Sequence, residues 1–104
     1  MDKRAQLVFC TCPDRESAGQ LATALVEQHL AACVNILPGI HSVYRWQGEM
    51  ESANELLLLI KTHSGVYRAL ERLIVQLHPY ELPEIIAVPV ENGLPAYLDW
   101  ISEP

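Results

Sequence analysis

Basic residues are scarce in this sequence of 104 residues. Seven lysines and arginines stand against thirteen aspartates and glutamates, which gives a formal net charge of −6 at pH 7. The few bases are scattered along the chain and form no stripe that could follow a phosphate backbone. The composition therefore argues against nucleic acid as a partner.

Cysteines and long apolar runs are also few. The three cysteines, Cys10, Cys12 and Cys33, cannot all pair within one chain. The first residues are followed by no apolar run long enough for a signal peptide or a membrane span. We therefore expect a reduced, cytoplasmic protein without a membrane partner.

Common catalytic motifs are missing as well. The sequence contains no glycine-rich phosphate loop, no serine nucleophile motif and no His-Glu-x-x-His array, so we expect no enzyme. It also contains no repeat or linker, and residues 1–104 are expected to form one domain.

Half of the residues are hydrophobic and only 19% are charged. A monomer of this size buries a limited share of its surface, so this composition favours a homo-oligomer.

The periodicity of the apolar residues predicts a regular order of elements. Strands are expected at 6–11, 31–46, 54–62 and 85–90, and helices at 17–30, 66–77 and 96–101. The second strand should bend at Pro38-Gly39, and a hairpin tip is expected at 47–49. The order β-α-β-β-α-β is that of the ferredoxin-like split βαβ fold, an α+β fold with both main helices on one sheet face. Here it carries a long central hairpin and a short C-terminal helix.

Side chains that can bind ligands or metal ions are most concentrated in the segment 78–84. Two prolines restrict its backbone, and it contains His78, Tyr80, Glu81 and Glu84. Tyr80 and the two glutamates could form a polar cleft with Lys61 and Glu55. The same residues could equally form an ordinary salt bridge between subunits. Trp46, near the hairpin tip, is expected to anchor a subunit interface.

The candidate metal ligands are Cys10 and His78, with Cys12 as an additional candidate. One residue separates the two cysteines, which places both thiols on the same face of a strand. Thiolate and imidazole are ligands that copper and zinc prefer. The alternatives are apolar packing for the cysteines and a charged helix cap for His78.

Several segments together resemble the CutA family of divalent-cation tolerance proteins. The resemblance spans nearly the whole chain and rests on these matches: Cys10-Thr11, the segments 30–35, 44–48 and 60–62, Glu55, the segment 78–84 and the ending 97–101. It implies a ferredoxin-like fold, a tight homotrimer similar to the PII signalling proteins, and a role in tolerance to copper and other divalent cations.

The resemblance also implies a metal site. The family member best linked to copper suggests ligands at the positions of Cys10 and His78 and a further histidine just before the latter, where this sequence has Leu77. Cys12, Glu81 or Glu84 could complete the site, and copper is the expected ion, with zinc as an alternative. A second hypothesis is a PII-like regulatory trimer. Its inter-subunit clefts, lined by Lys61, Tyr80, Glu84 and Trp46, would bind a small anionic metabolite or a partner protein.

Overall fold

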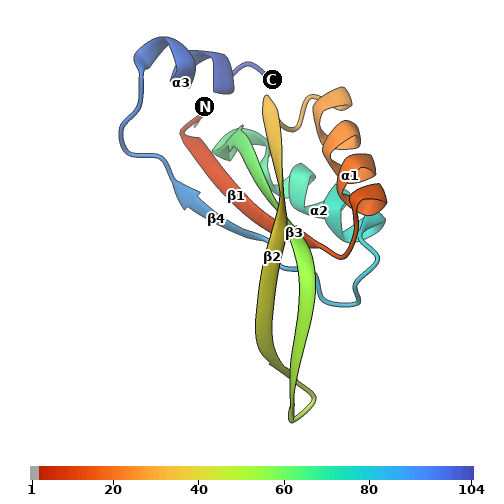
Figure 1. Cartoon of the computed structure of the whole chain (residues 1–104). Helices are drawn as coiled ribbons and strands as arrows, with labels where there is room; N and C mark the ends of the chain where they lie inside the picture. The colour runs from red at the N-terminus through yellow and green to blue at the C-terminus, as the bar shows by residue number, and fades with distance from the viewer. Residues whose placement is uncertain (1–2) are drawn as a thin grey trace.

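A computed structural model describes residues 3–104 and has the predicted order of elements (Figure 1). These are β1 (Ala5–Cys12), α1 (Arg15–Glu27), β2 (Cys33–Trp46), β3 (Glu49–His63), a 3-10 turn (Ser64–Val66), α2 (Tyr67–Leu77), β4 (Ile86–Pro89) and α3 (Pro95–Ile101). The strands form one antiparallel sheet in the order β2-β3-β1-β4. The ferredoxin-like prediction is confirmed. Within residues 3–104, no helix is long and apolar enough to cross a bilayer.

Helix α1 starts earlier and ends earlier than predicted. Asp14 is the N-cap, and its carboxylate accepts a hydrogen bond of 2.8 Å from the amide of Ser17. Asp14 thus satisfies one of the free amides of the first turn. At the other end, the amides of Leu30 and Ala31 both bond to the carbonyl of Leu25, which closes the helix before residue 30. The apolar periodicity continued past this closure and overestimated the length.

The core lies between the two main helices and one face of the sheet. Residues paired across antiparallel strands share a face, and Val8, Cys10 and Cys12 pair with Ile60, Leu58 and Leu56. All six are buried against α1 and α2. Cys10 and Cys12 on β1 therefore belong to the hydrophobic core.

The opposite sheet face is covered by neither α1 nor α2, and we call it the open face. It presents Leu7, Phe9, Leu57, Leu59, Ile86 and Val88. Four of these six side chains are half-buried, whereas Ile86 and Val88 on β4 are exposed. The apolar run of β3 is thus buried on one face and only partly covered on the other.

The β2–β3 hairpin extends well beyond the body of the molecule, at the end opposite to α3 (Figure 1). It accounts for the elongated dimensions of 44 × 25 × 23 Å. The predicted bend is present as a shift in pairing between Leu37 and Ile40, with Gly39 at a φ of 85°. At the tip, Gln47 and Gly48 both have positive φ, as a tight two-residue hairpin turn requires.

Candidate functional site

Two elements bring the predicted ligands Cys10 and His78 together. Cys10 and Cys12 lie on the helix-facing side of β1, and His78 follows the last residue of α2. The ligand atoms of Cys10, Cys12 and His78 all lie within 4.8 Å of one another. Both cysteines are fully buried and the histidine is 8% exposed. We call these three residues the thiol–imidazole cluster.

The ring of His78 is fixed by two hydrogen bonds to the backbone. Its Nδ1 accepts a bond of 3.0 Å from the amide of Tyr80. Its Nε2 lies 2.7 Å from the carbonyl of Thr11, and only a protonated nitrogen can donate to that oxygen. The ring is therefore neutral, with its proton on Nε2, and Cys12 Sγ lies 3.8 Å from the same nitrogen. His78 is the C-cap residue of α2, but its ring bonds to the backbone of Thr11 and Tyr80 rather than to the last carbonyls of the helix.

The two thiols hold their protons unequally. A hydrogen bond with Cys12, followed by burial, raises the pKa of the Cys10 thiol, and the nearby charges of Glu84 and Glu55 act in the same direction. The hydrogen bond with Cys10 lowers the pKa of Cys12, against the effect of burial. The pair therefore keeps a proton on Cys10, and Cys12 is the more easily deprotonated sulfur.

A groove of about 850 Å³ opens beside the cluster. It is lined by Thr11, the hairpin residues 42–46, Glu55 and the segment 79–84. Within it, the Tyr80 hydroxyl donates a hydrogen bond of 2.6 Å to Glu55 Oε2. Burial, this hydrogen bond and the charge of Glu55 raise the pKa of the Tyr80 phenol. We call this cavity the acidic groove, because three glutamates line it.

The acidic groove gathers most of the predicted cleft residues. Trp46, Tyr80, Glu81 and Glu84 all line it, but Lys61 does not. Lys61 lies six residues further along β3 than Glu55, about 20 Å away at roughly 3.4 Å per residue. Glu81 and Glu84, proposed as extra ligands, also lie in the groove and outside the group of three ligand atoms.

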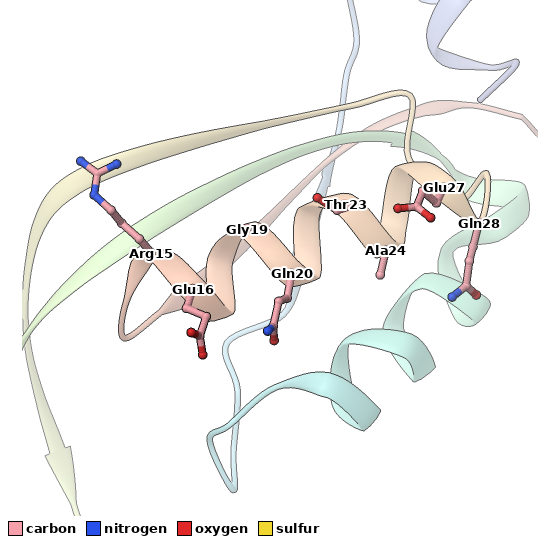
Figure 2. A pocket seen from close by; sticks show the side chains of 8 residues that line it. All are labelled: Arg15, Glu16, Gly19, Gln20, Thr23, Ala24, Glu27 and Gln28. Atoms are coloured by element: carbon pink, nitrogen blue, oxygen red, sulfur yellow. The ribbon is translucent and has the colours of Figure 1, made fainter.

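A second concave surface of about 600 Å³ lies along α1. Figure 2 shows its polar side chains, including Glu16, Gln20 and Gln28, spread along the outside of the helix. The concavity contains no cysteine, histidine or aromatic residue. We assign no chemistry to it.

Sequence reasoning missed the part that the backbone plays in the site. The carbonyl of Thr11, between the two cysteines, holds the His78 ring, and no side-chain pattern signals such a bond. Cys12 was considered only as a supplementary ligand, yet it lies within the cluster. The shared strand face of Cys10 and Cys12 was the signal that could have ranked it equally.

Comparisons with known proteins agree with this fold. The family model described as CutA1 divalent ion tolerance protein matches residues 6–104. The divalent-cation tolerance protein CutA of Thermus thermophilus is 50% identical over 98 residues, which cover 94% of this chain and 95% of that protein. Protein CutA of Mus musculus is 47% identical over 91% of this chain, which spans only 54% of the mouse protein.

Solved structures give the same result. The crystal structure of CutA from Xylella fastidiosa superposes with a TM-score of 0.92 at 51% identity, and the match covers 94% of each chain.

Proposed function

The chain belongs to the CutA1 divalent ion tolerance family, and from this premise we propose that its thiol–imidazole cluster binds a copper ion, with zinc as the alternative. Binding of the ion by a homotrimer would contribute to metal tolerance, and the role we propose is not enzymatic. The observation that carries the proposal is the convergence of Cys10, Cys12 and His78 within 4.8 Å in the buried core.

The donor set fits a soft or borderline metal ion. Two thiols and one imidazole are ligands for copper and zinc, and copper is at the top of the affinity order for such sites. Hard ions such as magnesium and calcium prefer oxygen ligands, and the cluster offers no carboxylate. The side chain of Leu77 has no ligand atom, so the third donor of the proposed site is Cys12 on β1 rather than the residue before His78.

Metal binding must compete with the hydrogen bonds of His78. Ligation through Nε2 requires that nitrogen to lose its proton, and with it the bond to the Thr11 carbonyl. A proton moved to Nδ1 would also break the bond from the Tyr80 amide. If both backbone groups are left without a hydrogen-bond partner, the cost is about 2–6 kcal/mol. Structural zinc sites bind with about 10–16 kcal/mol, so a metal ion can offset this cost.

The open face supports the homotrimer. Apolar side chains remain on it in the single chain, and a second layer is needed to cover them. Three subunits, rather than another number, are what the resemblance to the CutA family implies. We also propose a cytoplasmic location, because the cluster needs reduced thiols and reduced cysteines persist there.

Competition titration of the reduced protein with Cu(I) against a chromophoric chelator tests the metal site. We expect one ion per chain, with an affinity that falls at least about 100-fold in Cys10→Ala and in Cys12→Ala, because each removes a ligand. The matched control is Cys33→Ala, which removes the cysteine that lies outside the cluster. An unchanged affinity in Cys10→Ala, or an equal loss in Cys33→Ala, would overturn the proposal.

A further inference from the structure

The amide of Tyr80 depends on the ring of His78 for its hydrogen bond. It donates a bond of 3.0 Å to Nδ1, while Nε2 of the same ring donates to the carbonyl of Thr11 over 2.7 Å. A neutral imidazole has one acceptor nitrogen, and the Tyr80 amide uses it here. The ring therefore has no lone pair left for a metal ion unless one of its two bonds is given up.

Both possible modes of ligation by His78 remove this acceptor. If Nδ1 becomes the ligand, its lone pair is no longer available to the Tyr80 amide. If Nε2 becomes the ligand, the ring proton moves to Nδ1, which then donates instead of accepting. The bond to Thr11 can survive in the first case, whereas the bond from the Tyr80 amide is lost in both. Release of this amide is thus a necessary consequence of ligation by His78.

The released amide belongs to a segment that Tyr80 attaches to the rest of the protein. Residues 79–84 form neither helix nor strand, and most of them are exposed. Tyr80 attaches the segment at two points, through its amide to His78 and through its hydroxyl to Glu55 on β3, at 2.6 Å. The rings of His78 and Tyr80 also lie together, with centroids 4.9 Å apart. Loss of the first attachment leaves the segment held through the hydroxyl of Tyr80.

Two prolines restrict how the segment can respond. Pro79 lies between His78 and Tyr80, and Pro83 is near the other end. A proline fixes its own φ and restricts the residue before it, so the backbone around Tyr80 cannot easily absorb a displacement locally. Residues 79–84 line the acidic groove together with the hairpin residues 42–46. A displacement of Tyr80 therefore changes the shape of the groove.

We propose that the segment 79–84 is a metal-responsive switch. His78 holds it in place in the metal-free protein and releases the Tyr80 amide when the ring becomes a ligand, which alters the acidic groove. This inference rests on the proposed metal site, and it adds how the state of the buried cluster reaches the surface. Linkage makes the coupling reciprocal, so that whatever fixes Tyr80 weakens metal binding and whatever frees it strengthens metal binding.

Amide hydrogen exchange, followed by NMR on the reduced protein with and without Cu(I), tests the switch. We expect the Tyr80 amide to exchange at least about tenfold faster in the Cu(I)-loaded protein, although a bound ion stabilises the fold and slows exchange elsewhere. The matched control is the amide of Gly65, which donates in the same way to Nδ1 of His63, outside the cluster. Its exchange should be unchanged or slower.

Two tyrosine variants test the reciprocal effect. Tyr80→Phe removes the bond to Glu55, which opposes release of the segment, and should raise the Cu(I) association constant about two- to tenfold. Tyr67→Phe removes a similar bond, from the Tyr67 hydroxyl to Glu71 on α2, and should leave the affinity unchanged. General damage to the fold would lower the affinity, so the direction of the change separates the switch from a merely structural role.

Three results would overturn the switch. These are a His78 ring whose nitrogen shifts place the proton on Nδ1 in the metal-free protein, a Tyr80 amide equally protected with and without Cu(I), and an affinity that is unchanged or lower in Tyr80→Phe. If Cu(I) does not bind at all, the proposed function fails and the switch fails with it. If Cu(I) binds through Cys10 and Cys12 but the Tyr80 amide stays protected, only the switch fails.

Discussion

The ring of His78 has two roles: it would bind the proposed metal ion, and it holds the loop that follows α2. Its two nitrogens bond to the backbone at Thr11 and Tyr80, and they thereby tie the start of the segment 78–84 to β1. A ligating His78 would have to release at least one of these bonds. Metal binding in the core is thus coupled to the loop that lines the acidic groove.

Metal affinity should rise with pH. The raised pKa of Cys10 means that its thiol is protonated at neutral pH, whereas a metal ligand must be deprotonated. Cys12, whose pKa is lowered, gives up its proton more easily than Cys10, so release of the Cys10 proton is the step that a higher pH must favour. We expect the Cu(I) association constant to increase about tenfold per pH unit between roughly pH 6.5 and 8.5. Competition titrations corrected for the chelator's own protonation measure this slope, and a flat profile would contradict it.

Removal of the Tyr80 hydroxyl should destabilise the protein. In Tyr80→Phe the carboxylate of Glu55 stays buried but loses its hydrogen-bond donor, which costs about 1–3 kcal/mol. Urea unfolding at one fixed protein concentration measures the change in the free energy of unfolding. Tyr97→Phe, which removes the hydroxyl of a more exposed tyrosine on α3, is the control and should be near neutral. Equal stabilities for the two variants would refute this role of Tyr80.

The sequence could predict one part of the geometry of the candidate site. Period-two alternation along β1 places Cys10 and Cys12 on one face without any tertiary information. His78 joins them only because α2 packs on that face and ends beside β1, which no local pattern encodes. Its tautomer depends on two backbone groups and could not be predicted at all. Lys61 does not line the groove of its own chain, because it lies six residues from Glu55 along β3, and its place in a cleft between subunits stays a prediction.

At the scale of elements, the β2–β3 hairpin depends on backbone conformations that most residues avoid. Gly39 lies where the pairing of β2 and β3 shifts, and Gly48 is in the tip turn, both with positive φ. No heavy atom lies within 4 Å of a Cβ added at Gly39, so a larger residue there would meet strain rather than a clash. The position requires glycine for its backbone freedom.

The same substitution at two glycines should have opposite effects. Gly39→Ala forces alanine into the left-handed region and should lower the free energy of unfolding by about 1–2 kcal/mol. Gly19→Ala lies inside α1, also with no atom within 4 Å of the new Cβ, and should raise it by roughly 0.5–1 kcal/mol. Chemical denaturation of both variants tests this. Destabilisation of equal size at the two sites would contradict the explanation.

Element types followed from periodicity, but some boundaries did not. The run of leucines in β3 predicted a central strand buried on both faces, and β3 is central in the sheet. Within that run, Leu58 and Ile60 on the helix-facing side are fully buried in the single chain, whereas Leu57 and Leu59 on the open face are only partly buried. The difference marks the open face as a surface that a further layer would cover.

At the scale of the whole molecule, assembly should depend on the open face. Ile86 is on the edge strand β4, is 56% exposed and pairs with Phe9 on the open face. Ile86→Lys would place a charge in the proposed interface and should shift sedimentation from trimer towards monomer at nanomolar concentration. Val75→Lys is the control, because Val75 is 58% exposed on α2, which covers the other sheet face. A parent protein that sediments as a monomer would refute the trimer.

X-ray absorption spectroscopy of the Cu(I)-loaded, reduced protein tests the central claim most directly, because it distinguishes sulfur from nitrogen and oxygen ligands. We predict two sulfur ligands and one imidazole nitrogen per copper ion, from Cys10, Cys12 and His78. The spectrum should be unchanged in Cys33→Ala and should lose a sulfur ligand in Cys12→Ala. A coordination shell of oxygen and nitrogen alone would show that the cysteines are only core residues and that copper binds elsewhere.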